Sequence, residues 1–179
     1  MYRKRDFSEV LSSELVSATG GIIAGTLLAI FTDKLFLLPG LFIFLPGFLQ
    51  LKGAIAGSLA ARLGTELHTR RIRPGKKSRL ITENKLASFI LIFFVSLVLG
   101  VTAYLLTFFL FNQNYPRLLL IPLLAAVISS IFLFPLTTKL TLWMYKHHHD
   151  PDNVIGPYVT TLGDIESILS ILFAIIVLT

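Results

Sequence analysis

Cysteine is absent from the 179-residue chain, and charged residues are scarce. Without thiols the chain can form neither a disulfide nor a thiolate metal site. Only 15% of the residues are charged, against about 25% in an ordinary soluble domain. Hydrophobic residues make up 54% of the chain, and the mean hydropathy is +0.78. This balance predicts an integral membrane protein with no room for a separate soluble domain.

Motifs of enzymes and of nucleic-acid binding are also missing. The sequence contains no glycine-rich phosphate loop, no nucleophile elbow and no HExxH pair. The net charge of +6 comes from basic residues that flank apolar runs, so membrane topology explains it better than nucleic acid does. We therefore expect neither an enzyme nor a nucleic-acid partner.

Apolar runs recur five times along the chain. A helix that spans the hydrocarbon layer takes about 20 residues. The runs predict helices over residues 15–32, 35–67, 86–111, 118–145 and 155–178, with residues 1–14 at the interface. The expected fold is an all-α bundle of five transmembrane helices that forms one domain over residues 1–179.

Glycine and proline mark two of these spans. The TGGIIAG run at residues 19–25 supplies small side chains that let another helix approach closely. In the second span, Pro39-Gly40 and Pro46-Gly47 predict a broken helix. Interrupted helices often line transport sites, although a plain proline kink is an equal alternative.

Basic residues give the orientation. The RRIRPGKKSR stretch at residues 70–79 and the N-terminal RKR are separated by two spans, so both lie on one side. The positive-inside rule makes that side the cytoplasm, where these residues also suit anionic lipid headgroups. The sequence predicts a multi-pass protein of the plasma membrane with a cytoplasmic N-terminus and an outer C-terminus.

The last span carries a carboxylate, Asp164, inside an apolar run. A carboxylate at the bilayer centre costs about 2.5–3.5 kcal/mol, so it is a functional-site hypothesis by default. Thr160, Thr161 and Ser167 lie one helical turn away and complete a polar stripe. Such hard oxygens favour Mg²⁺ or Ca²⁺. The alternative is a structural Asp164 that bonds a neighbouring helix.

Three further carboxylates are candidates for the ion path. Glu166 follows Asp164 by two positions and points about 160° away from it on a helix. It would therefore reach the ion path, a subunit contact or another helix, such as the one bearing Arg62. Asp150 and Asp152 precede the helix, where they would concentrate cations or complement the helix dipole.

The histidine run at residues 147–149 supports a second hypothesis. Together with Asp150 and Asp152 it would form the metal site of a membrane enzyme. Three consecutive histidines on a helix point in three directions, so a solvated interfacial run is the simpler interpretation.

Two longer motifs resemble a known family. DPDNVIGPYVTTLGDI at residues 150–165 resembles the last-helix signature of the MgtE-type divalent-cation transporters. LPGFLQLKGAIAGSLAARLGTEL at residues 45–67 resembles their second-helix signature, in the form found in the eukaryotic solute-carrier branch and its archaeal single-unit relatives.

The resemblance implies a channel or transporter for divalent cations, most simply Mg²⁺. Because the sequence has no nucleotide-binding motif, we expect the ion to move down its electrochemical gradient. In the family, the aspartate that matches Asp164 holds a hydrated ion in a pore between two five-helix units, assisted by the position of Thr160. Gly53 and Ala54 fall on the ion path, and Ala54 replaces the usual asparagine. A homodimer or heterodimer is implied, with no cofactor beyond the transported ion; a non-conducting partner subunit is the alternative.

Overall fold

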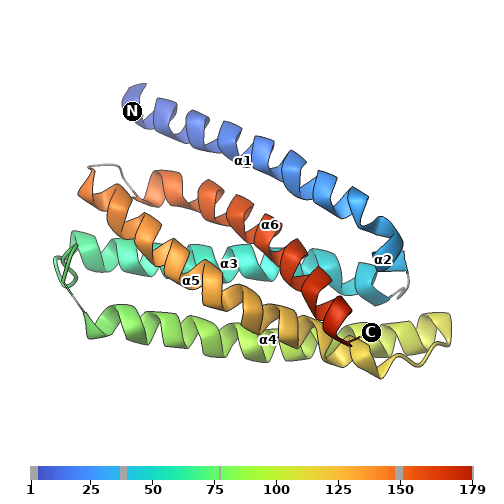
Figure 1. Ribbon diagram of the computed structural model, residues 1–179. Coiled ribbons are helices and arrows are strands. Elements are labelled where there is room, and N and C mark those ends of the chain that lie inside the picture. Colours follow the sequence, from blue (N-terminus) through green and yellow to red (C-terminus); the bar gives the residue numbers. More distant parts are fainter. Residues whose placement is uncertain (1–3, 37–39, 77, 148–150, 179) are drawn as a thin grey trace.

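The computed structural model describes residues 4–36, 40–76, 78–147 and 151–178, and every regular element within these ranges is helical (Figure 1). The elements are α1 (Lys4–Ile30), α2 (Thr32–Phe36), α3 (Gly40–His68), α4 (Arg79–Phe111), the 3-10 helix η1 (Pro116–Leu119), α5 (Ile121–Lys146) and α6 (Pro151–Leu178). Five helices are long and apolar enough to cross a membrane, which confirms the predicted all-α bundle of five spans.

The second long helix differs from the prediction. We expected a break at Pro46-Gly47, but α3 continues through both residues as one helix. A proline removes a single helical hydrogen bond, and membrane helices tolerate this loss where neighbouring helices pack around them. The break expected at Pro39 falls on residues 37–39, which lie outside the described part of the chain.

Two helices begin earlier than expected. The first begins at Lys4 rather than near residue 15, since neither glycine nor proline interrupts residues 4–14. The last begins at Pro151 rather than near residue 155, so Pro157 lies inside it. A proline suits the first helical position, because the backbone N–H that it lacks would have no partner there.

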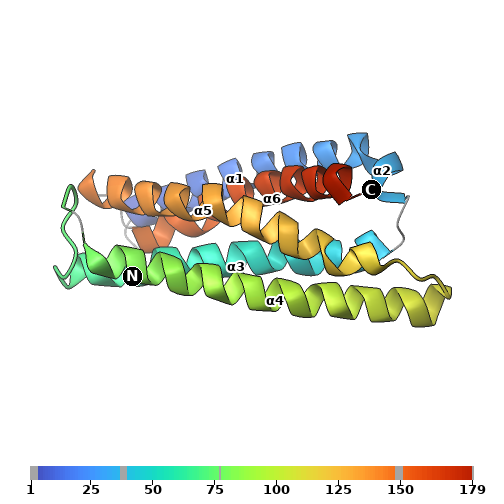
Figure 2. The same ribbon diagram turned by 60° about the horizontal axis from the view of Figure 1, so that its bottom comes forward.

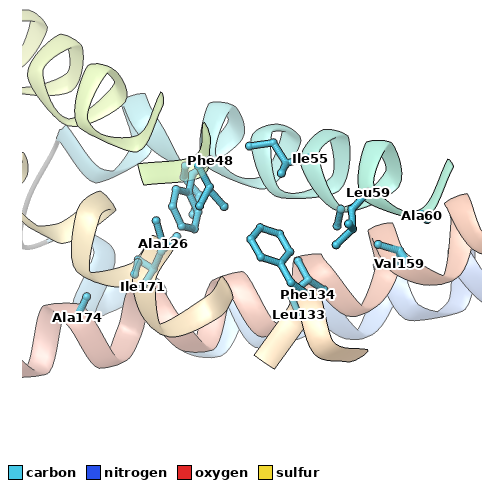
Figure 3. Close-up of a cluster of buried hydrophobic side chains, with 14 of the residues drawn as sticks. Phe48, Ile55, Leu59, Ala60, Ala126, Leu133, Phe134, Val159, Ile171 and Ala174 are labelled. Carbon is cyan, nitrogen blue, oxygen red and sulfur yellow. The ribbon is translucent and has the colours of Figure 1, made fainter. Parts of the chain in front are cut away.

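Helix α6 lies at the centre of the packing. It contacts α1, α3 and α5, while α4 contacts α3 and α5. Figure 2 shows α3 and α4 as one layer, with α5, α6 and α1 lying over it. Figure 3 shows the apolar core between α3, α5 and α6, which includes Phe48, Ile55, Leu59, Phe134, Val159 and Ile171.

Helix α1 packs on α6 through small residues, as the TGGIIAG run predicts. A Cβ atom on Gly20 would collide with the side chain of Thr161, so only glycine permits this approach. Ala24 is buried against Ile168 and Leu172 one turn further along. Much of the rest of α1 is exposed in the single chain.

The helices alternate in direction across the bundle. The start of α1, the basic loop between α3 and α4, the end of α5 and the start of α6 lie at one end, while α6 finishes at the other (Figures 1 and 2). This arrangement agrees with the expectation that the N-terminal and loop basic residues share one side of the membrane. The assignment of that side to the cytoplasm stays a prediction.

We expect Gly100→Ala to destabilise the fold. The new Cβ would lie 2.8 Å from the backbone oxygen of Leu119 and 3.3 Å from that of Leu118, where the chain turns back from α4. Such overpacking costs about 1–3 kcal/mol and should lower the midpoint of thermal unfolding in detergent. Gly57→Ala is the matched control, since a Cβ there meets nothing within 4 Å. Equal midpoints for the two variants would contradict this packing.

Candidate functional site

A pocket of about 380 Å³ opens between α3 and α6. Its lining residues are Pro46, Leu49, Gln50, Gly53 and Ala54 from α3 and Thr160 and Asp164 from α6. The α3 residues recur at helical spacing and so share one face. A Cβ on Gly53 would lie 3.5 Å from both the methyl and the hydroxyl of Thr160, so the two helices touch closely here.

Asp164 brings a free carboxylate to this pocket. It lies near the middle of the candidate span Val154–Leu178 and is half-buried. Among the described residues it has no hydrogen-bond or ion-pair partner, and Thr160, one turn earlier, has none either. Most other helical threonines of the chain donate to a backbone carbonyl of the preceding turn, for example Thr137 and Thr141. Both polar groups on this face of α6 are therefore available to something in the pocket.

The residues of the predicted polar stripe lie in three different environments: the α1 contact, the buried interior and the pocket. Thr161 faces α1, where its hydroxyl donates to the Ser17 hydroxyl over 3.0 Å and lies 3.4 Å from the Ser17 carbonyl oxygen. Ser167 is fully buried, and its hydroxyl oxygen has no hydrogen-bond partner among the described residues. Thus Thr160 and Asp164 share the pocket, whereas Thr161 and Ser167 do not line it.

Glu166 lies on another side of α6, as its spacing from Asp164 predicts. Its Oε1 accepts a hydrogen bond of 2.8 Å from Ser170, and both residues line a largely apolar groove along α5. The suggested contact between Glu166 and Arg62 is wrong, because the Arg62 guanidinium bonds residues of α3 and α4 instead. It donates to the Ser58 carbonyl over 3.2 Å and to the Ser88 hydroxyl over 3.0 Å.

The remaining sequence candidates are less completely described. Gly53 and Ala54 line the pocket, as proposed for the ion path. Asp152 lies in the first turn of α6, while Asp150 falls outside the described residues, as do two of the three histidines. His147 is exposed and contacts the Trp143 carbonyl at 2.8 Å. Within the described ranges no three His, Asp or Glu side chains form a metal-binding group.

Gln50 is a pocket residue that sequence reasoning missed. Its amide is exposed on α3, on the same face as Gly53 and Ala54. Helices α3 and α6 run antiparallel and approach each other at Gly53 and Thr160. One helical turn further in the same direction, α3 presents Gln50 and α6 presents Asp164. The signal was the helical spacing of Gln50 from Gly53 and Ala54, but a single neutral amide does not stand out in an apolar run.

Comparison with known proteins gives one family. The model of a family described as MgtE, divalent cation transporter, matches residues 45–175 and so includes all of the pocket residues. No curated protein matches the chain.

We expect Thr161→Val to destabilise the protein more than Thr160→Val. The first substitution removes the hydrogen bond to Ser17, which contributes about 0.5–1.5 kcal/mol, while the second removes no bond within the described chain. Thermal unfolding of the two isosteric variants in detergent measures the difference. If Thr160→Val were the less stable of the two, the assignment of Thr161 to the α1 contact would be wrong.

Proposed function

The chain belongs to the MgtE family of divalent cation transporters, and from this premise we propose that it conducts Mg²⁺ through a pore formed by two five-helix units. Its five candidate spans make it a multi-pass membrane protein. The family is one of transporters, so transport takes the place of the membrane-enzyme hypothesis. The observation that carries the proposal is the carboxylate of Asp164, which lines an open pocket within its span.

The pocket suits a hydrated ion better than a dehydrated one. Its side-chain oxygens come from Asp164, Thr160 and Gln50, a hard but sparse set. Mg²⁺ gives up water reluctantly and is usually held by few carboxylates. Six waters take up about 180 Å³ at about 30 Å³ each, which the pocket volume of about 380 Å³ can hold. In this proposal Asp164 attracts the ion, and the hydroxyl and amide oxygens accept hydrogen bonds from its water.

A second unit would complete the site. Pro46, Gln50, Ala54 and Thr160 are exposed in the single chain, so the pocket opens on its surface. Polar groups that face hydrocarbon are costly and need protein or water beside them. An equivalent face on a second five-helix unit would enclose a wet pore and bring a second carboxylate opposite Asp164. Two carboxylates would balance the double charge of the ion; a homodimer is the simplest such assembly.

The basic residues set the direction of this pore. With the α3–α4 loop in the cytoplasm, α6 begins on the cytoplasmic side of the plasma membrane and carries Asp152 in its first turn there. The chain serves as one pore-forming domain over residues 1–179. Movement follows the electrochemical gradient of the ion.

Asp164→Asn tests the central claim. The neutral amide loses the attraction for the cation, and we expect Mg²⁺ flux into liposomes to fall about tenfold or more, since tenfold corresponds to about 1.4 kcal/mol. Asp33→Asn is the control, because that carboxylate is exposed on the short helix α2. Undiminished flux in Asp164→Asn would refute the proposal. If the purified wild-type chain carried no flux, it would instead be the partner subunit of another conducting chain.

Ala54→Cys tests whether the pocket is wet within the membrane. Because the native chain lacks cysteine, the new thiol is unique. We expect a charged, water-soluble thiol reagent to modify it in native membranes, and Mg²⁺ to slow that modification. Val98→Cys on α4 is the control, since Val98 is 62% exposed on an apolar helix that faces lipid in this proposal. Equal reactivity at the two positions would contradict a water-filled pocket.

A further inference from the structure

The groove that contains Glu166 has the size and lining of a small-molecule site. This α5–α6 groove has a volume of about 690 Å³, and small-molecule sites occupy about 300–1,000 Å³. Such sites are mostly apolar and carry a few polar groups that orient the ligand. Two of the lining residues, Glu166 and Ser170 of α6, are polar. The apolar lining residues are Ile128, Ile131 and Phe132 of α5 and Leu169 and Phe173 of α6.

The groove lies at the middle of the predicted membrane layer and faces outward. Glu166 is at the centre of the candidate span Val154–Leu178, and Ile131 is at the centre of the candidate span Pro116–Lys146. Ile131 and Phe132 are both more than half exposed. An occupant would therefore reach the groove through the hydrocarbon layer, so it must be soluble in lipid.

The carboxylate of Glu166 has capacity for a further partner. Its Oε1 accepts one hydrogen bond of 2.8 Å from Ser170, and its Oε2 has no donor among the described residues. An ionised carboxylate can accept about four hydrogen bonds, and a serine hydroxyl supplies no positive charge. Lys52, which is buried in α3, does not line the groove, and its ammonium has no hydrogen-bond partner within the described chain.

These properties together define the chemical class of the occupant. A lipid acyl chain would match the apolar side chains but would leave the carboxylate of Glu166 facing hydrocarbon, which is costly. A small hydrated cation would match the charge but not the apolar walls. An amine with an apolar body matches both, since its ammonium group is opposite in charge to the carboxylate and donates strong hydrogen bonds to it.

We propose that the α5–α6 groove binds a lipid-soluble amine, with the apolar body of the amine against Phe132 and Phe173 and its ammonium group at the Glu166 carboxylate. The site is separate from the pocket between α3 and α6, because Asp164 lines that pocket and Glu166 does not. The inference therefore does not depend on the transport function proposed above.

Photolabelling of the protein in liposomes tests the proposal. The probe is dodecylamine with a diazirine group in its chain, and the comparison probe is the matching dodecanol, which has the same chain without the charge. We expect the amine to label the α5 and α6 segments of the groove about tenfold more than the alcohol, because only the amine makes a charge-assisted hydrogen bond. Equal labelling by the two probes would indicate a groove for acyl chains and would overturn the proposal. The absence of labelling by either probe would indicate that a second copy or another protein covers the groove, which would also overturn it.

Glu166→Gln should remove the preference for the amine, because the amide that replaces the carboxylate is neutral. Glu14→Gln is the matched control, since Glu14 is a carboxylate on the candidate span Phe7–Ile30 that does not line the groove. Asp164→Asn is the control for the separate pocket. Both control variants should keep the preference of the wild-type chain. If either control lost the preference as Glu166→Gln does, the attraction would come from the general charge of the protein and the proposal would be wrong.

Leu169→Trp tests the groove without changing the carboxylate. Leu169 lines the groove and is half exposed, so the larger side chain can extend into the groove without entering the core. We expect labelling by the amine to fall about tenfold, and this variant decides the question if Glu166→Gln fails to fold. Unchanged labelling of the Leu169→Trp chain would place the bound amine outside the groove and would overturn the proposal.

Discussion

The lack of water in the hydrocarbon layer is the constraint on which this structure depends. Every polar side chain at that depth needs a partner in the protein or a wet cavity. Most of the helical threonines meet this need by donating to a carbonyl one turn earlier, as Thr107 and Thr138 do. Asp164 and Thr160 are exceptions that lie together at an open pocket, and this is why we propose the pocket as the ion site.

Helix α6 contacts three helices, α1, α3 and α5, and different residues of α6 face each of them. Thr161 bonds α1, Asp164 and Thr160 face the pocket beside α3, and Glu166 lies toward α5. Adjacent residues on a helix differ in direction by about 100°, so a short segment can serve all three faces. The pocket is thus formed by a helix that is also anchored on both flanks, which restricts how far its carboxylate can move.

The sequence predicted the five spans and the α1 contact well, because each leaves a local signal, while the place of Asp164 on an ion path stays a prediction. A charge or a glycine cluster in an apolar run is conspicuous without any knowledge of the fold. The different environments of Thr160 and Thr161 were not predictable, since they depend on which helix lies beside each face of α6. Gln50 was missed for the same reason: the residues that share its pocket on α6 are more than one hundred residues away in the sequence. The continuity of α3 through Pro46 likewise reflects its packing.

The start of α1 and the end of α6 lie at opposite ends of the bundle, because the described residues form an odd number of long helices (Figure 1). If two copies of this five-helix unit were joined directly, the second copy would enter the membrane upside down. A tandem protein with both halves upright would need one more crossing in its linker. Two units made as separate chains would avoid this requirement, since each would insert by the same rules and the two upright halves could then meet by diffusion in the plane of the bilayer.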